Sequence, residues 1–350
     1  MALELIRGNE AIAEGAIRAG CRFYTGYPIT PQNELFEYMA KRLPQVGGIF
    51  LQCESEVAGI NMIWGAACTG TRAMTSSSGP GISLMSEGLT ALAAGMLPCV
   101  VVDVTRAGPG LGRIGPAQSD YRQVTKGGGH GDYRAIVLGP ASTQEMADLA
   151  MLAFHLADLY RNPVVILMDG MLGQMMEPVD FDLVKPFPIP DKPWAIRGKG
   201  DGPRKVIYAA PFDDPGLIQL NQELAEKYGQ IEEQEQRWEE IFLEEAHLVV
   251  VAFGSAARVA LDAVQAARAK GYPVGMIRPI TLWPFPRKGF KKIRHTAKAF
   301  LDVEMNAGQM QEDLERVVGP DFPIHHLGQG GGKIIYPDEV YEEIKKLTRK

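Results

Sequence analysis

The sequence lacks any pattern of cysteines that would hold a metal ion. Its four cysteines are scattered along the chain and form no Cys-x-x-Cys pair: Cys21, Cys53, Cys68 and Cys99. This spacing argues against a zinc site and against an iron–sulfur cluster held by this chain alone. The same cysteine usage fits a reducing, cytoplasmic location.

A surplus of basic residues and a long apolar run are also missing. The net charge of −6 leaves no excess of cations to neutralise a row of phosphates, so we expect no nucleic acid partner. No apolar run reaches the roughly 18 residues of a membrane span, so we expect no membrane association. The N-terminal segment contains Glu4 and Glu10 and lacks the apolar core of a signal peptide.

What the sequence does contain is enough chain for two domains, because 350 residues can bury two sizeable cores. In the first part, helical and extended patterns alternate. Helices are predicted at about 8–20, 31–42, 55–70, 81–95 and 143–160, and strands at about 22–26, 48–52, 72–76, 99–105, 135–140 and 163–169. Continuous β-branched runs between helices indicate a parallel sheet that is covered on both faces.

The middle of the chain changes in composition. From Glu177 to Gly216 it is rich in Pro, Gly and Asp, which is typical of a linker. Apolar residues at three- and four-residue intervals then predict an acidic amphipathic helix over 215–246. A second alternation of strands and helices begins at 247. We therefore expect an α/β protein with two doubly wound domains, at 1–180 and 247–350, joined by a linker and helix at 181–246.

In open parallel sheets, functional residues collect at the carboxyl ends of the strands. The first such end carries Thr30 and Pro31, within the run YPITPQNE. We expect Thr30 to cap a helix whose first residue is Pro31. The free amides of that helix end would attract a small anion. Capping alone explains these residues at least as well as an anion site does.

The second strand end carries two acids, Glu54 and Glu56, in front of a dry helix rich in Gly and Ala. Acids in the first turn stabilise the helix dipole by about 0.3–1 kcal/mol, which is one interpretation. The other starts from burial, because a carboxyl group held there would be partly desolvated and suited to share a proton with a ligand. The residues alone leave both interpretations open.

The third strand end carries Arg106, which follows a buried strand and precedes the glycine-rich loop AGPGLG. Arginine binds a carboxylate through a bidentate fork, and the glycines allow the backbone to approach a ligand. The loop is not a dinucleotide-binding fingerprint, because Gly108-Pro109-Gly110 lacks the third glycine and no helix is predicted to begin there.

Taken together and in this order, the three strand ends resemble the alpha subunit of 2-oxoacid:ferredoxin oxidoreductases. The resemblance rests on the runs around YTGYPITPQNE, ESEVAGINMIWGAACTG and VDVTRAGPGLGRIGPAQSDY, and RPITLWPFP and VEMNAGQM extend it to residue 312. The segment from GPGLG through KGGGHGDY is most similar to the branched-chain (2-oxoisovalerate) type. The resemblance implies a pyrimidine-binding domain of thiamine diphosphate enzymes, followed by a domain like the C-terminal domain of transketolase.

The resemblance also implies roles for individual residues. Glu56 matches the glutamate that contacts N1′ of the aminopyrimidine of thiamine diphosphate, where a hydrogen bond favours the tautomer that activates the cofactor. Thr30 and Arg106 match residues that hold the substrate carboxylate or carbonyl. Ser78 and Gly79 are expected to touch cofactor or substrate through their backbone. Glu54 has no matching role and is expected to serve the helix start or the surface.

The partners implied by the resemblance are three further chains. A beta subunit would hold the diphosphate and its Mg²⁺, a gamma subunit would make much of the coenzyme A contact, and a ferredoxin-like delta subunit and the beta subunit would carry [4Fe–4S] clusters. External ferredoxin would accept the electrons, and the assembly would be a dimer of heteromers. The run Gly200-Asp201-Gly202 lies in the predicted linker, so we do not take it as a diphosphate and metal motif. No metal ligand is expected in this chain.

The expected activity is the coenzyme-A-dependent oxidative decarboxylation of a 2-oxo acid to acyl-CoA and CO₂, with electrons passed to ferredoxin. A branched-chain substrate is the first choice, and 2-oxoglutarate, pyruvate and aryl-pyruvates are alternatives within the family. The alternative from another class is a non-catalytic assembly subunit that kept the fold. The presence of Thr30, Glu56 and Arg106 argues against that alternative.

Overall fold

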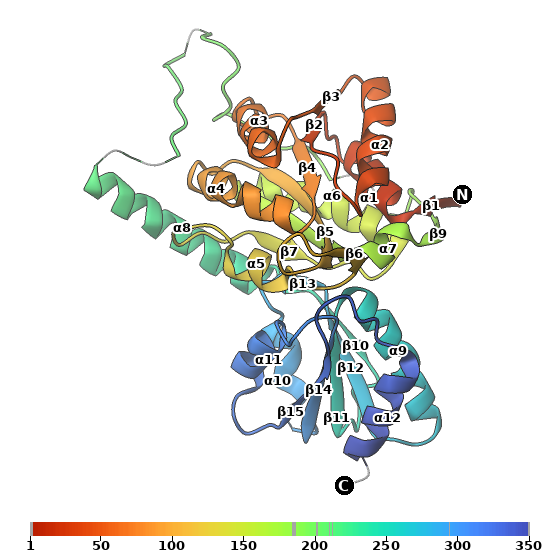
Figure 1. Cartoon of the computed structure of the whole chain (residues 1–350). Coiled ribbons are helices and arrows are strands. Elements are labelled where there is room, and N and C mark those ends of the chain that lie inside the picture. Colours follow the sequence, from red (N-terminus) through yellow and green to blue (C-terminus); the bar gives the residue numbers. More distant parts are fainter. Residues whose placement is uncertain are drawn as a thin grey trace.

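The computed structural model describes residues 3–183, 187–200, 202–209, 211, 213–293 and 295–348. The chain forms two α/β domains, each built around a mainly parallel sheet. One domain lies above the other in Figure 1. The helices are α1 (Gly8–Arg18), α2 (Asn33–Arg42), α3 (Glu56–Cys68), α4 (Pro80–Ala94), α5 (Tyr121–Lys126), α6 (Thr143–Tyr160), α7 (Gly170–Gln174), α8 (Asp214–Gln234), α9 (Gly254–Ala269), α10 (Arg287–Ile293), α11 (Gln311–Val318) and α12 (Pro337–Thr348), with a 3₁₀ turn η1 (Pro44–Val46).

The strands fall into three sheets, two of which form the cores. They are β1 (Glu4–Arg7), β2 (Phe23–Gly26), β3 (Ile49–Gln52), β4 (Ala73–Ser77), β5 (Cys99–Ala107), β6 (Arg113–Pro116), β7 (Ile136–Leu138), β8 (Pro163–Asp169), β9 (Met176–Val179), β10 (Trp238–Ile241), β11 (Leu248–Ala252), β12 (Val274–Pro279), β13 (Thr281–Trp283), β14 (Ala299–Glu304) and β15 (Ile324–Gly328). A small antiparallel pair, β1 with β9, forms the third sheet.

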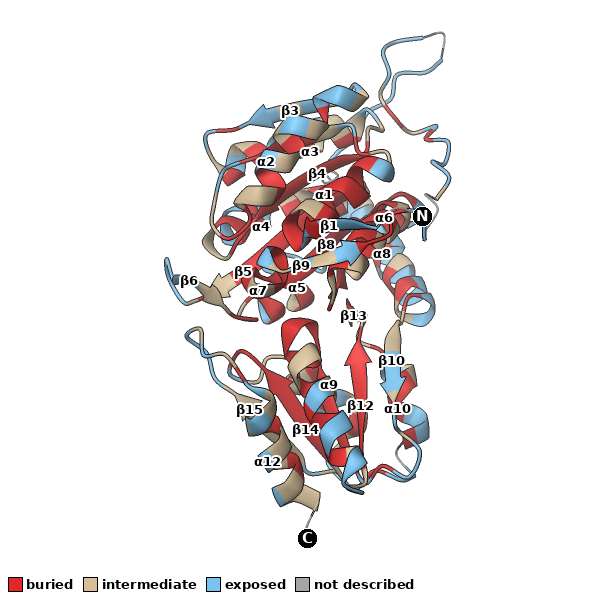
Figure 2. Cartoon of the chain, turned by 90° about the vertical axis from the view of Figure 1, so that its right-hand side faces the viewer, coloured by how far each residue is buried: buried red, intermediate tan, exposed pale blue. Residues whose placement is uncertain are grey.

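The first sheet has the order β13-β7-β8-β5-β4-β2-β3, and all neighbours from β7 to β3 are parallel. Its central strands β4, β5 and β8 are almost wholly buried, as continuous β-branched runs require (Figure 2). Helix α1 packs on α6 and α3 packs on α4, and the two pairs cover opposite faces of the sheet (Figure 1). The predicted doubly wound architecture is confirmed.

The second sheet has the order β10-β12-β11-β14-β15, with only β10 antiparallel to its neighbour. Helices α9 and α12 pack together over a buried apolar cluster on this sheet. Its parallel strands and covering helices repeat the architecture of the first sheet on a smaller scale. Among the helices of the described residues, none combines the length and the apolar character that crossing a membrane demands.

Two features beyond the predicted linker differ from expectation. The amphipathic helix α8 ends at Gln234 and does not continue to 246, because Trp238–Ile241 pairs with β12 as a strand. The segment Thr281–Trp283, inside the run RPITLWPFP, joins the first sheet through β7 and does not stay in the second. In both places the partner strand is distant in sequence, and pairing with it overrides the local periodicity. The run Gly200-Asp201-Gly202 has its central residue outside the described residues.

Candidate active site

The strand ends of the first sheet open onto a cavity of about 600 Å³. Gly79 after β4, Arg106 near the end of β5 and Asp120 before α5 form one part of its wall, and Gln309 of the second domain forms another. Two of the predicted residues, Gly79 and Arg106, therefore line one cavity. The other three, Thr30, Glu56 and Ser78, are not among its lining residues, and Thr30 lines a separate cavity of about 540 Å³.

Glu56 is the first residue of α3 and is buried, with 5% of its surface exposed. Its Oε1 accepts a hydrogen bond of 3.1 Å from the Ser77 hydroxyl at the end of β4. Gly81 makes room for this pair, because a Cβ at that position would overlap both the Ser77 hydroxyl and the Glu56 carboxylate. The dry Gly- and Ala-rich sequence thus holds a carboxylate inside the protein at a strand end.

The two acids before α3 are separated by the structure. The helix is capped by the Ser55 hydroxyl, which accepts from the Ala58 amide at 3.3 Å. Glu54 is exposed and is not the cap, so of its two expected roles only the surface role remains. Glu56 alone points into the protein.

Ser78 and Gly79 form the turn from β4 into α4. Gly79 has φ 44° and ψ −102°, a left-handed conformation that favours glycine. The Ser78 hydroxyl is buried and has no hydrogen-bond partner among the described residues. A buried hydroxyl without a partner is costly, so this atom marks a place where a ligand group would be welcome.

Arg106 contacts Thr30 through the Thr30 backbone. Arg106 Nη1 donates to the Thr30 carbonyl at 3.0 Å and Nη2 donates to the Leu111 carbonyl at 2.8 Å. The Arg106 Nε is buried and has no partner among the described residues. The guanidinium thus holds the glycine-rich loop and the turn before α2, and its Nε remains able to donate to a ligand.

The expectation that Thr30 caps a helix beginning at Pro31 is wrong. Helix α2 begins at Asn33, with Gln32 as its N-cap and no capping side chain. The Gln32 amide instead donates to the Ile29 carbonyl at 3.1 Å, which makes 29–32 a turn ahead of the helix. The Thr30 hydroxyl is left with a long contact of 3.5 Å from Asn33 Nδ2.

A pair of buried acids, Asp103 and Asp120, was missed by sequence reasoning. Asp103 is fully buried in β5, and neither of its carboxylate oxygens has a partner among the described residues. Burial raises the pKa of Asp103 well above its usual range, and the charge of Asp120 adds to the rise. Burial also raises the pKa of Asp120 to about 6, although the Gly79 amide and the Arg106 charge oppose it. The signal was a charge inside the apolar run VVVDVT.

A cluster of two acids and a histidine lies in the second domain, where Asp302, Glu304 and His326 converge. His326 Nδ1 is 2.7 Å from Asp302 Oδ2. The Glu304 oxygens accept from the amides of Met310 and Gln311, at 2.9 and 3.1 Å. These bonds organise the loop after β14 and occupy the carboxylate of Glu304. Asp302 Oδ1 and His326 Nε2 have no partner among the described residues, but two such atoms alone do not make a metal centre.

Two protein families match the chain. Residues 14–204 match the family described as "Pyruvate flavodoxin/ferredoxin oxidoreductase, thiamine diP-bdg", and residues 246–340 match "Pyruvate:ferredoxin oxidoreductase core domain II". The first match includes the predicted site residues, from Thr30 to Arg106. The second begins just before β11 and includes the loop after β14.

Similar proteins extend over the whole chain. The "Ketoisovalerate oxidoreductase subunit VorB" of Methanothermobacter thermautotrophicus is 48% identical over 348 residues, which cover 99% of both chains. The "2-oxoglutarate synthase subunit KorA" of Methanocaldococcus jannaschii is 37% identical, over 97% of this chain and 98% of that one.

Two solved structures are similar in fold. A 2-oxoglutarate:ferredoxin oxidoreductase from Magnetococcus marinus, with 2-oxoglutarate, coenzyme A and succinyl-CoA bound, superposes with a TM-score of 0.85 at 28% identity. The match covers 98% of this chain but spans only 65% of that one. A split-gene transketolase superposes with a TM-score of 0.64 at 13% identity, which shows a shared fold alone.

Proposed function

The chain belongs to the 2-oxoacid:ferredoxin oxidoreductase family, and we propose that it supplies the aminopyrimidine half of a thiamine diphosphate site in an enzyme for branched-chain 2-oxo acids. It is an alpha-type subunit of an oxidoreductase, and its full-length relatives are named as oxidoreductase subunits. The observation that carries the assignment of the site is the buried carboxylate of Glu56, held at a strand end between Ser77 and Gly81.

The residues around Glu56 fit an aminopyrimidine. A buried carboxylate is suited to a hydrogen bond with a ring nitrogen, and the dry surroundings strengthen that bond. The unpartnered hydroxyl of Ser78, the residue directly after Ser77, offers a second polar group at the same strand end. When bound, thiamine diphosphate supplies the electron sink that accepts the electrons of the bond to the departing CO₂. Glu56 holds or releases the proton at the pyrimidine nitrogen.

Arg106 is proposed to hold the substrate. Its guanidinium lies at the cavity wall and keeps its Nε without a partner among the described residues, so it can add a bond to a carboxylate oxygen or a carbonyl oxygen. Thr30 is proposed to assist from the adjoining turn, with its hydroxyl. The Gly79 backbone, which lines the same cavity as Arg106, is proposed to contact cofactor or substrate.

A branched-chain substrate is favoured by two observations. The ketoisovalerate subunit shares more identity with this chain than the 2-oxoglutarate subunit does, 48% against 37%. In addition, Leu111, an apolar side chain with 82% of its surface exposed, lies at the rim of the cavity. An apolar substrate tail would cover it, whereas a second carboxylate would meet no cation there except Arg106 among the residues lining the cavity.

The remaining parts of the enzyme are proposed to lie on other chains. They are a beta subunit that binds the diphosphate and Mg²⁺, a gamma subunit that contacts coenzyme A, a ferredoxin-like delta subunit with [4Fe–4S] clusters shared with beta, and external ferredoxin as acceptor. A dimer of such heteromers is the proposed assembly. A cytoplasmic location is proposed as well, in keeping with four free cysteines.

A substrate panel on the purified complex tests the proposal. Reduction of a viologen dye is followed with coenzyme A present and with 2-oxoisovalerate, 2-oxoglutarate or pyruvate as substrate. We expect kcat/KM to be highest for 2-oxoisovalerate. A preference for 2-oxoglutarate or pyruvate would overturn the substrate assignment, and no dye reduction with any 2-oxo acid would overturn the catalytic one.

A further inference from the structure

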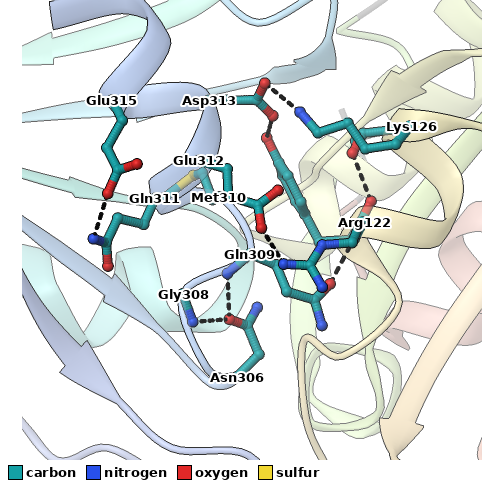
Figure 3. A network of polar contacts seen from close by, with 12 residues as sticks. Arg122, Lys126, Asn306, Gly308, Gln309, Met310, Gln311, Glu312, Asp313 and Glu315 are labelled. Carbon is teal, nitrogen blue, oxygen red and sulfur yellow. Dashed lines mark hydrogen bonds and ion pairs between the residues drawn. The ribbon is translucent and has the colours of Figure 1, made fainter. Parts of the chain in front are cut away.

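The loop that follows β14 lies across the junction of the two domains. This loop, Met305–Met310, belongs to the second domain but bonds to the segment Gln118–Arg122 of the first. Figure 3 shows the bond between Gln309 and Arg122. Met305 and Gln118 exchange bonds: the Gln118 amide donates to the Met305 carbonyl at 3.1 Å, and the Met305 amide donates to Gln118 Oε1 at 3.0 Å. A short ladder thus joins the domains beside the cavity.

The loop is given a fixed shape from within. Asn306 Oδ1 accepts from the amides of Gly308 and Gln309, at 2.8 and 3.0 Å (Figure 3). Asn306 Nδ2 donates both to Glu304 Oε2 and to the Gln118 carbonyl, each at 2.8 Å. Because the shape is fixed, the loop can present the next side chain, Gln309, in one orientation.

Gln309 uses both ends of its amide on the first domain. Its Nε2 donates to the Ser119 carbonyl at 2.8 Å, and its Oε1 accepts from the Arg122 amide at 2.7 Å. The two bonds bracket Asp120, which lines the cavity. Because one bond at each end of the amide fixes its orientation, Gln309 is suited to hold the wall.

The held segment connects directly to Arg106. The Ser119 hydroxyl donates to the Arg106 carbonyl at 2.7 Å, and the Arg106 charge opposes the rise in the pKa of Asp120. We propose that Gln309 is a positioning residue of the substrate site, which fixes Ser119 and Asp120 and through them Arg106. This inference rests on the proposed function, in which Arg106 holds the 2-oxo acid.

The domains are joined independently of Gln309. The Tyr121 hydroxyl donates to Asp313 Oδ2 at 2.7 Å, Lys126 pairs with Asp313, and Arg122 pairs with Glu312. These contacts bind α5 to α11 (Figure 3 labels the charged members). A Gln309→Ala protein should therefore keep its fold and its domain contact while losing the two bonds at the cavity wall.

The experiment uses the complete complex with Gln309→Ala. We expect the KM for the 2-oxo acid to rise about tenfold, the equivalent of ~1.4 kcal/mol, with a smaller change in kcat. Amide hydrogen exchange at Arg122 should accelerate, because that amide loses its acceptor. Gln311→Ala is the matched control, since the Gln311 side chain bonds to Glu315 and faces away from this segment. Gln309→Glu keeps the acceptor for Arg122 but loses the donor to Ser119, so protection at Arg122 should be retained.

A double-mutant cycle separates this inference from the proposed function. If Gln309 acts through Arg106, adding Gln309→Ala to Arg106→Ala should change KM by less than about twofold, because coupled positions are not additive. Additive effects, or an unchanged KM in Gln309→Ala alone, would overturn the positioning role. An unchanged KM in Arg106→Ala alone would instead overturn the substrate-binding role of Arg106.

Discussion

The loops at the ends of the two parallel sheets of this protein differ in their hydrogen bonding. At the edge of the first sheet, polar atoms of Ser78, Arg106 and Asp120 are buried without a partner among the described residues. At the edge of the second, the loop after β14 is closed by hydrogen bonds: Glu304 and Asn306 are bonded several times over, to their own loop and to the first domain. Asp302 Oδ1 and His326 Nε2, which lie on the adjacent strands β14 and β15, have no partner among the described residues. The same architecture thus produces one edge with unsatisfied atoms at its loops and one edge whose loop is satisfied.

The difference assigns a separate role to each edge: the first is suited to bind a ligand, and the second to hold its neighbour in place. An unpartnered buried group carries a free-energy cost that a ligand can remove, so the first edge is prepared to bind. A saturated network gains nothing from a ligand and becomes rigid, which suits it to hold its neighbour in place. The variants below test each side of this comparison, from the largest expected effect to the smallest.

The strongest test of the first edge is Glu56→Gln. The amide keeps the size of the carboxyl group but cannot hold the proton for a ring nitrogen, so we expect turnover to fall at least about a hundredfold. Dye reduction by the purified complex measures the loss, and gel filtration checks that the complex remains assembled. Glu54→Gln is the matched control, because Glu54 is exposed and should leave turnover unchanged. Normal turnover in Glu56→Gln would remove Glu56 from the site.

The strongest test of the second edge is Glu304→Ala. Three donors, the Met310 and Gln311 amides and Asn306 Nδ2, would lose their acceptor, which should destabilise the protein by about 3 kcal/mol. Thermal unfolding of the complex measures this loss as a lower midpoint. Glu315→Ala removes an exposed carboxylate of the neighbouring helix and should change the midpoint little. Equal midpoints in the two variants would show that the loop does not depend on Glu304.

Arg106→Ala tests whether the unsatisfied edge binds the substrate. Loss of a charge-assisted bond should raise the KM for the 2-oxo acid by about 10- to 100-fold, with a smaller effect on kcat. Steady-state dye reduction provides both constants. Arg106→Lys keeps the charge but loses the planar fork, so its KM should fall between those of the wild type and Arg106→Ala. A KM equal to the wild type in Arg106→Ala would contradict the role.

Much of this comparison could be predicted from local sequence, and part of it could not. The strands β5 and β8 and the helix α6 lie where β-branched runs and apolar spacing predicted them, because burial on both faces writes a local pattern. Glu56 stood out in the sequence because a charge preceded a dry helix. Such signals need no knowledge of distant residues.

The parts that sequence reasoning missed depend on distant contacts. The strand β13 joins β7 across more than 140 residues, since Thr281 pairs with Leu138, and no local pattern announces that partner. The bonds of Gln309 to Ser119 and Arg122 are likewise made between domains. The Thr30 cap was wrong because the chain turns once more before α2 begins. Local propensity cannot rank such alternatives, whose energies are set by tertiary packing.

The smallest expected effect concerns the acid pair and appears only when pH is varied. Because the pKa of Asp120 is raised to about 6 by burial, the folded protein binds a proton more tightly than the unfolded chain does. The protonated carboxyl group of Asp120 therefore contributes to the stability of the folded protein. This contribution is fully present below about pH 4 and is lost as pH rises through about 6. Asp120→Asn removes this loss. We expect the unfolding midpoint of the variant to rise relative to that of the wild type as pH increases between these values. Above them, the difference between the two midpoints should stay constant. A constant difference across the window would mean that Asp120 ionises freely, and the first edge would then be less unsatisfied than its geometry indicates.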